Sequence, residues 1–275
     1  MIDLHTHSTA SDGTDTPGEL SRKVREAGIE IFALTDHDTI TGAMSLTGKN
    51  FVRGIEFSCR TENSRCHILG MNYDPENAEF QEALHEGERL RRAKFYRRIE
   101  FLRDTFSITF TPEEISQLES IPGTGKPHLA NMIVSKGLAH DKQEAITRYI
   151  DKCRTGNSRI DAGQAISAII SAGGVPVWAH PLGGEGERTL TPIEFMNTLD
   201  ELMNYGLEGL ECWYSKYELA MCERLAEIAR VNGLYVSGGS DYHGTNKNIP
   251  LGKLNAENIT VDDEKFTILK RLRGE

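Results

Sequence analysis

The chain begins MIDLHTHSTASDGTD (residues 1–15), a short apolar segment followed by two histidines and an aspartate. The first residues have the pattern of a strand. Side chains two residues apart on a strand project to the same side, so His5 and His7 can present two imidazoles to one point in space. Metal ligation is one interpretation. The other is an exposed N-terminus with incidental histidines, and the rest of the chain has to decide between them.

The composition is that of an ordinary globular enzyme. The chain has 275 residues, of which 38% are hydrophobic, enough for one large domain or for a domain with a sizeable insertion. Lys and Arg total 31 against 41 Asp and Glu, a formal net charge of −10. Such a surface repels nucleic acid and anionic membranes at long range, so we expect no binding to long duplex nucleic acid or to membranes. A phosphate-bearing substrate would have to be captured locally.

No basic segment followed by an apolar run opens the chain, and no apolar stretch is long enough to span a bilayer. The five cysteines are scattered and contain no CxxC pair. This pattern argues against both a disulfide framework and a thiolate zinc site. These features together predict a cytoplasmic protein.

Short apolar segments alternate with helical patterns, which predicts an α/β fold with a parallel sheet or barrel. The strands are expected within residues 1–5, 29–38, 51–58, 66–73, 175–181, 207–214 and 234–244. The helices between them are expected at residues 17–27, 161–174, 191–206, 216–233 and from about 261 onward. Residues 74–157 interrupt the alternation with helical segments only. We therefore expect a barrel formed by residues 1–73 and 158–275, and a helical insertion of residues 74–157 that contributes to the substrate pocket.

Histidines and carboxylates mark the ends of the predicted strands. Four strands end in DLHTH, FALTDHD, VPVWAHP and SGGSDYHG, and a fifth carries Glu56 near its end. The carboxyl ends of parallel strands meet at one face, which holds the active site in such folds. His67 opens its segment, CHILG, so the strand pattern does not explain its place at this face.

Neutral imidazole and carboxylate together suit divalent zinc, manganese or iron. The ligands are too many for one ion, so we expect a cluster of two or three ions that share a carboxylate. Glu56 is the candidate for the shared ligand, because a carboxylate can bridge two ions and an imidazole cannot.

Six segments, read in order, resemble the motifs of the polymerase-and-histidinol-phosphatase (PHP) family: HTHSTASDGTDTP, ALTDHDT, GIEFS, CHILG, AHP and SDYHG. The match covers residues 1–73 and about 160–245, and the helical insertion resembles that of the stand-alone bacterial phosphoesterases. The resemblance implies a distorted (β/α)7 barrel with a helical insertion domain. It also implies a phosphoesterase with two or three divalent ions (Mn, Fe or Zn).

The resemblance further implies three ligand sets. They are His5, His7, Glu56 and Asp241 for one metal, Glu56, His67 and His180 for a second, and Asp12, His37 and His243 for a third. Many members of the family have histidine where this chain has Asp12, and a carboxylate is still a competent ligand. Asp36, Asp38 and Glu211 are expected to orient ligands and not to bind metal.

Two metal ions can hold a phosphoryl group, supply hydroxide from a bound water and stabilise the leaving oxygen. We therefore expect phosphoester hydrolysis by metal-activated hydroxide, with no catalytic residue beyond the metal-bound water. In agreement, the chain contains neither a GxSxG nucleophile elbow nor a GxxxxGK[ST] phosphate loop.

The segment GTGKPHLAN places Lys126 and His128 at a glycine-rich entry into a helix, and the N-terminus of a helix attracts anions. The resemblance implies that these two residues contact the substrate phosphate. The alternative is a surface loop before an ordinary helix. Arg154 and Arg159 are further candidates. The arginine-rich stretch from Arg89 to Arg103 is interpreted as a solvated helix face, since acidic residues precede it as the helix dipole favours.

The expected function is hydrolysis of a small phosphorylated metabolite, in the first place a nucleotide (a mono- or bisphosphate) or the end of a short oligonucleotide. Histidinol phosphate is an alternative substrate, which an acidic pocket lining would favour. A non-catalytic PHP-type binding module is an alternative of another class. Metal-dependent amidohydrolases share an HxH start, but the TDHDT and SDYH segments argue against them.

Overall fold

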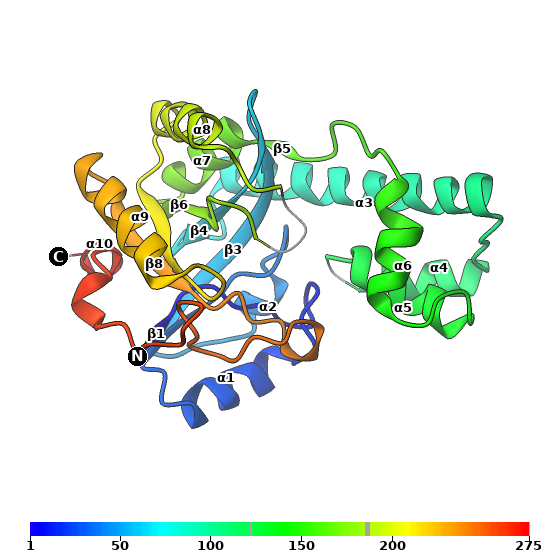
Figure 1. Cartoon of the computed structure of the whole chain (residues 1–275), viewed down its shortest axis with the longest axis horizontal. Helices are drawn as coiled ribbons and strands as arrows, with labels where there is room; N and C mark the ends of the chain where they lie inside the picture. The colour runs from blue at the N-terminus through cyan, green and yellow to red at the C-terminus, as the bar shows by residue number, and fades with distance from the viewer. Residues whose placement is uncertain (122, 185–187, 275) are drawn as a thin grey trace.

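A computed structural model describes residues 1–121, 123–184 and 188–274. Its strands form a sheet in the order β1-β2-β3-β4-β6-β7-β8 that curls into a nearly closed barrel, with helices outside it (Figure 1). The strands are β1 (Ile2–Asp3), β2 (Ile31–Leu34), β3 (Phe51–Arg60), β4 (Arg65–Met71), β5 (Ile160–Asp161), β6 (Val175–Ala179), β7 (Gly209–Tyr214) and β8 (Tyr235–Gly239). The short β5 pairs with β3 beside this order. The expected distorted (β/α)7 barrel is confirmed.

The helices of the barrel lie close to their expected positions. They are α1 (Pro17–Glu26), α2 (Thr41–Met44), α7 (Ala162–Ser171), α8 (Pro192–Asn204), α9 (Leu219–Val231), α10 (Ile268–Arg273) and the 3-10 turns η2 (Gly244–Asn246) and η3 (Asp263–Lys265). Helices α1 and α8 both begin with a proline and a threonine capping box, which explains why their starts are readable from sequence. The short elements α2 and β5 were not expected.

One strand departs from the expected parallel arrangement. β1, β2 and β3 are parallel, and so are β6, β7 and β8, but β4 runs antiparallel to both β3 and β6. Only residues 61–64 separate β3 from β4. A parallel connection needs a crossover of a dozen or more residues, so this short link can only form a hairpin.

Residues 74–157 contain helices α3 (Ala78–Phe106), α4 (Pro112–Glu119), α5 (Lys126–Ser135), α6 (Lys142–Arg148) and the 3-10 turn η1 (Ile150–Lys152). Helix α3 extends away from the barrel, and α4, α5 and α6 pack beside its far part (Figure 1). An apolar cluster of their own, which includes Phe95, Leu129 and Ile133, is separate from the barrel core around Trp178. This separate cluster favours the proposed division into a barrel and a helical insertion.

The barrel closes between its first and last strands. Leu4 donates its backbone N–H to Gly238 at 3.1 Å, and Asp241 donates to His5 at 2.8 Å. The buried Asp3 side chain accepts from the backbone and hydroxyl of Ser240, at 2.8 and 2.6 Å. These bonds satisfy a carboxylate that would be costly to bury alone. In the described part of the chain, no helix is long and apolar enough to cross a membrane.

Closure requires a glycine at position 239, because a Cβ there would overlap the backbone and Cβ of His5. Gly239→Ala is therefore expected to lower the free energy of unfolding by about 1–3 kcal/mol, the usual cost of overpacking. Urea denaturation measures this. Gly18→Ala is the matched control, since nothing lies within 4 Å of a Cβ on Gly18. Equal stability of the two variants would contradict the close approach.

Candidate metal centre

The predicted ligands gather at one edge of the barrel. His5 and His7 follow β1, His37 follows β2, His180 follows β6, and Asp241 and His243 follow β8, while Glu56 lies within β3. His67 lies near the start of β4. Because β4 runs antiparallel, its start lies at the edge where the parallel strands end, and this explains the position that the strand pattern left open.

The first ligand set surrounds a single point. His5 Nε2 lies 3.1 Å from His7 Nε2. Asp241 Oδ1 lies 3.6 Å from His5 Nε2 and 3.4 Å from His7 Nε2. Glu56 Oε2 approaches the same two nitrogens at 3.2 and 3.1 Å. Each of the two imidazole nitrogens thus has both predicted carboxylate ligands within 3.6 Å.

The second set lies around the other oxygen of Glu56. Its Oε1 is 2.8 Å from His67 Nδ1 and 3.0 Å from His180 Nε2. His67 Nδ1 and His180 Nε2 are 3.3 Å apart. The two oxygens of Glu56 therefore face different groups of histidines, which is the arrangement expected of a bridging carboxylate.

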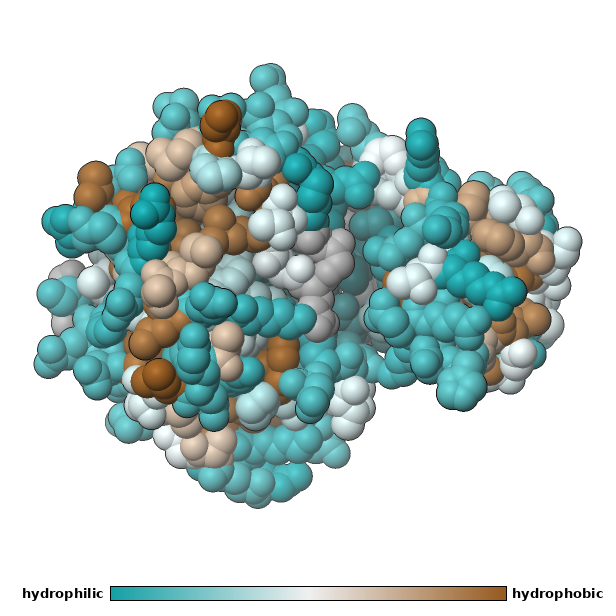
Figure 2. Space-filling view, viewed as in Figure 1, coloured by the Kyte–Doolittle hydropathy of each residue, from teal (hydrophilic) through white to brown (hydrophobic). Residues whose placement is uncertain are grey.

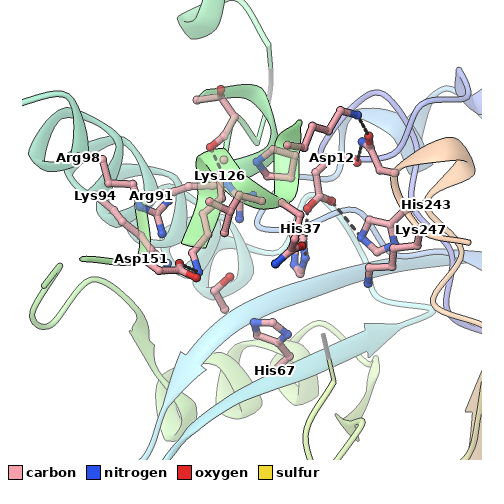
Figure 3. Close-up of a pocket in the computed structure, with 18 of the residues that line it drawn as sticks. Asp12, His37, His67, Arg91, Lys94, Arg98, Lys126, Asp151, His243 and Lys247 are labelled. Carbon is pink, nitrogen blue, oxygen red and sulfur yellow. Dashed lines mark hydrogen bonds and ion pairs between the residues drawn. The ribbon is translucent and has the colours of Figure 1, made fainter. Parts of the chain in front are cut away.

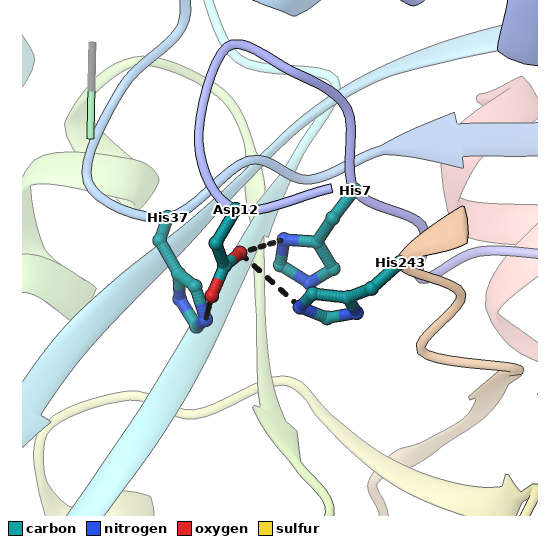
Figure 4. Close-up of side chains that lie close together, drawn as sticks. All are labelled: His7, Asp12, His37 and His243. Atoms are coloured by element: carbon teal, nitrogen blue, oxygen red, sulfur yellow. Dashed lines mark ion pairs between the residues drawn. The ribbon is translucent and has the colours of Figure 1, made fainter. Parts of the chain in front are cut away.

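Asp12 is the centre of the third set (Figure 4). Its Oδ1 lies 3.2 Å from His243 Nε2 and 3.8 Å from His7 Nδ1, and its Oδ2 lies 3.9 Å from His37 Nε2. His37 also turns Nδ1 toward Glu56 Oε2, at 3.1 Å. The three sets are contiguous, since Glu56, His7 and His37 each face two of them.

These residues fit divalent ions. Ligands about 2.0–2.2 Å from one ion lie about 3–3.5 Å from each other at octahedral or tetrahedral angles, and most of the separations above are in this range. Glu56 Oε2 has three imidazole nitrogens within 3.2 Å and yet accepts no hydrogen bond from any described residue. Donor atoms that converge on a shared point are what a metal site requires.

The carboxyl groups of the site are held as anions. Burial by itself raises the pKa of Glu56, but the surrounding histidines, His37 foremost, hold that pKa well below its usual range. For Asp241 the same penalty of burial is outweighed chiefly by Lys247, and its pKa is also well below the usual range. Anionic oxygens are the form that coordinates metal.

A second layer of side chains orients the ligands. Glu211 Oε1 lies 2.9 Å from His5 Nδ1, and its Oε2 accepts the backbone N–H of His180 at 2.6 Å. Asp241 Oδ2 accepts from Tyr214 at 3.0 Å and from Lys247 at 2.6 Å, which leaves Oδ1 toward the histidines. A carboxylate that accepts a hydrogen bond from the non-ligating nitrogen of a metal-binding histidine fixes the tautomer of that histidine.

The predicted orienting roles of Asp36 and Asp38 agree with the structure. Asp36 accepts from Ser8 and from the Ser11 hydroxyl, and thereby holds the loop that carries Asp12. Asp38 accepts the backbone N–H of Ser58 at 2.7 Å. Neither belongs to a group of described residues that could hold a metal ion.

Three of the six described non-glycine residues with positive φ lie at the same edge. Asp38, His180 and Asp241 have φ angles of 52°, 30° and 57°, in the left-handed region that residues with a Cβ rarely adopt. Such conformations persist only where the surrounding structure imposes them, and they cluster at functional sites. Here these conformations orient the side chains that follow the ends of the strands.

A cavity of about 620 Å³ opens above the ligands. Asp12, His37, His67 and His243 line one side of it, whereas His5, His7 and Glu56 lie beneath and are buried. Side chains of α3, α5 and α6 line the other side (Figure 3). The surface is hollowed between the barrel and the lobe that carries α4, α5 and α6 (Figure 2). The site therefore lies between the barrel and the helical segment.

The four predicted phosphate-binding residues are not brought together. Lys126 and Arg159 line the cavity, and Lys126 Nζ lies 2.5 Å from Asp151 Oδ1. His128 is absent from the described lining, and its Nδ1 accepts the backbone N–H of Gly125 at 3.1 Å at the start of α5. Arg154 is exposed and lies outside the described lining.

Besides Lys142 and Lys247, three further cations of the cavity were missed at the sequence level. Arg91, Lys94 and Arg98 line it from α3 (Figure 3). The solvated-face interpretation is wrong for these three and right for Arg89, Arg92, Arg97 and Arg103, which are exposed. Their spacing of three and four residues was the available signal, because it places all three on one face of a helix.

Comparison with known proteins agrees with this geometry. Residues 3–71, which contain six of the nine predicted ligands, match the family model described as PHP domain. The chain carries a PHP domain. The predicted membership is thereby confirmed.

Relatives of this PHP protein extend over nearly its whole length. It is 29% identical over 265 residues to a 5'-3' exoribonuclease of Haemophilus influenzae. The alignment covers 91% of this chain and 93% of the relative. It is also 29% identical to a 3',5'-nucleoside bisphosphate phosphatase of Chromobacterium violaceum. That alignment covers 88% of this chain and 87% of the relative. Both names describe cleavage of phosphoester bonds and bear out the prediction of a phosphoester hydrolase.

Solved structures share the fold. A protein from Bifidobacterium adolescentis, assigned by prediction as a metal-dependent phosphoesterase, superposes with a TM-score of 0.78 at 28% identity, over 96% of this chain and 97% of that one. An amidohydrolase from Chromobacterium violaceum, with bound sulfate and no metal, superposes with a TM-score of 0.80 at 23% identity, over 99% of this chain and 96% of that one. The second similarity shows the fold alone.

Glu211→Gln is expected to weaken metal binding by about 10- to 100-fold, because the amide no longer provides an anion for His5. Isothermal titration of the metal-free protein with manganese measures the change. Glu227→Gln is the control, since Glu227 is exposed on α9 and pairs with Arg230. Unchanged affinity in Glu211→Gln would contradict the orienting role.

Proposed function

We propose that this PHP protein hydrolyses a phosphoester of a nucleotide with more than one phosphate, or of a short oligonucleotide end. The ions would be two or three of Mn, Fe or Zn, held by His5, His7, Asp12, His37, Glu56, His67, His180, Asp241 and His243. Bound there, such ions lower the pKa of coordinated water and neutralise phosphoryl oxygens. The observation that carries the proposal is the position of this cluster at the floor of a cationic cavity.

The charge of the cavity favours an anionic substrate. Of the described residues that line it, seven are Lys or Arg and two are Asp: Arg91, Lys94, Arg98, Lys126, Lys142, Arg159 and Lys247 against Asp12 and Asp151. Cations in a recess concentrate anions locally even when the whole protein is acidic. Arg91, Lys126 and Lys247 pair with carboxylates, and the four other basic residues favour a second phosphate beyond the one at the metal ions.

The same charges argue against histidinol phosphate. Its free amine is cationic at neutral pH, and it would need carboxylates at the substrate end of the cavity. Asp12 faces the ligand histidines and Asp151 already pairs with Lys126. The names of the two relatives, an exoribonuclease and a nucleoside bisphosphate phosphatase, point to nucleotide substrates instead.

Arg98 and Lys94 are suited to bind the phosphate that is not cleaved. Arg98 is 6% exposed, and its Nε has no hydrogen-bond partner among the described residues. Burial and the nearby Arg159, Arg98 and Arg91 lower the pKa of Lys94 to about 6. An anion bound beside these two residues would return Lys94 to its charged form and stabilise the buried Arg98 guanidinium.

Asp241→Ala is expected to abolish phosphate release from a nucleoside 3',5'-bisphosphate without unfolding the protein, because it removes an anionic donor of the first set. Phosphate release by manganese-reconstituted protein, with metal content and thermal melting measured in parallel, tests this. Asp200→Ala, on the exposed side of α8, is the control. Full activity of Asp241→Ala would refute the assignment.

Arg98→Met is expected to lower kcat/KM for the nucleoside 3',5'-bisphosphate by about tenfold or more, the worth of a hydrogen bond to a charged group. The value for a nucleoside 5'-monophosphate should change less than about twofold. Arg103→Met, exposed on the same helix and paired with Asp104, is the control. An equal loss for both substrates would show that Arg98 does not bind a second phosphate.

A further inference from the structure

A second cavity, of about 800 Å³, adjoins the first. It lies beneath the turn of the β3–β4 hairpin and beside the segment from η1 to β5. The two cavities share five lining residues: Lys94, Arg98, Lys126, Asp151 and Arg159. Figure 3 shows Lys94, Arg98, Lys126 and Asp151 at the side of the first cavity opposite His243. These shared residues form a cationic ridge between the metal centre and the second cavity.

The second cavity is itself cationic. Of its described lining residues, seven are Lys or Arg and two are acidic: Arg60, Arg65, Lys94, Arg98, Lys126, Arg159 and Arg188 against Glu62 and Asp151. Arg188 pairs with Glu194 through two hydrogen bonds, and Arg60 lies 3.7 Å from Asp161. No ion pair within the described ranges involves Arg65, so its charge remains open to a ligand.

Arg60 and Arg65 place two positive charges beside the turn of the hairpin. They are directly opposite each other across the hairpin, and like charges in such cross-strand pairs are destabilising. Neither residue is needed for the apolar core, since the buried side of the hairpin is made by residues such as Phe57 and Ile68. An anion bound between the two guanidinium groups would remove the repulsion, and this points to a ligand.

We propose that the second cavity holds the sugar-phosphate backbone of a single-stranded oligonucleotide, beyond the nucleotide at the metal centre. The proposal rests on the function proposed above. Each cavity alone has the volume of a small-molecule site, so the first accommodates one nucleotide and the second gives room for the next ones. A row of cations beside polar walls is the electrostatic track that single-stranded nucleic acid needs.

The lining also indicates which part of the oligonucleotide the second cavity would contact. The apolar residues among its described members are Ile150, Leu190 and Cys153, and none of the described members is aromatic. Stacking of bases on a protein usually needs aromatic side chains, whether or not it depends on base sequence. Recognition is therefore by backbone phosphates, with affinity that depends on length and not on base sequence.

The test is binding of nuclease-resistant oligonucleotides to the manganese-loaded full chain. The probes are 2'-O-methyl phosphorothioate strands of two, four and eight nucleotides, with a 5' phosphate and a 3' fluorescein for anisotropy. We expect Kd to fall about tenfold or more from two to four nucleotides, as further phosphates reach the second cavity. Strands of different base sequence should bind alike.

Arg65→Glu should weaken binding of the four-nucleotide strand by about tenfold and leave the two-nucleotide strand within about twofold. Arg89→Glu changes the net charge equally on an exposed site outside both linings and should have no such effect. Kd independent of length, or an equal effect of both variants, would overturn the proposal.

Failure of the two proposals can be told apart. Arg65→Glu and Arg89→Glu should hydrolyse a nucleoside 3',5'-bisphosphate at the wild-type rate, because that substrate ends at the ridge. If the bisphosphate is hydrolysed but Kd does not depend on strand length, only the proposal for the second cavity is wrong. If wild-type protein with bound metal hydrolyses neither a bisphosphate nor the end of a short oligonucleotide, the proposed function is wrong, and the proposal for the second cavity with it.

Discussion

The arrangement of the site depends on one carboxylate, Glu56, buried among five imidazoles. Its side chain is 1% exposed, and both oxygens have histidine nitrogens within 3.2 Å. A charge so deeply buried is tolerated only where its surroundings are strongly positive. The histidines that surround it come from four separate segments, so the whole barrel edge must be assembled before Glu56 is stabilised. Divalent ions would complete this balance of charge.

The barrel provides the assembly by bringing distant residues to one edge. Closure between β1 and β8 places His5 beside Asp241, more than 230 residues along the chain, and Gly239 permits the close approach. The antiparallel β4 brings His67 to the same edge from the opposite direction. Glu211 then fixes His5 and the backbone of His180 together. The geometry of the ligands is thus a property of the closed sheet.

The helical segment supplies the other half of the site. Arg91 of α3 donates to Asp38 at 2.8 Å, next to His37, and so ties the cationic wall to the barrel edge. Anions are attracted to a recess between the two parts, although the chain has a formal net charge of −10. In the proposed function, the helices and the β3–β4 hairpin select the bulk of the substrate and the barrel edge cleaves the bond.

Much of this was readable from the sequence, because local patterns determined it. Strand ends, helix starts at Thr-Pro pairs, and the nine candidate ligands all follow from short segments whose residue types have few alternative uses. Arg91, Lys94 and Arg98 were interpreted as solvated, since a basic helix face shows its spacing but not what it packs against. Arg154 and His128 were expected at the phosphate, yet local geometry takes Arg154 to the surface and His128 to a helix cap.

The sequence by itself therefore determined which residues are candidates for the metal centre and at which strand ends they stand. Only the tertiary structure decided how closely the ligands approach one another, why His67 joins them, and which cations line the cavity. The physical reason is that strand and helix patterns are local, whereas strand direction, barrel closure and the packing of α3 over the barrel edge depend on contacts between residues far apart in the chain.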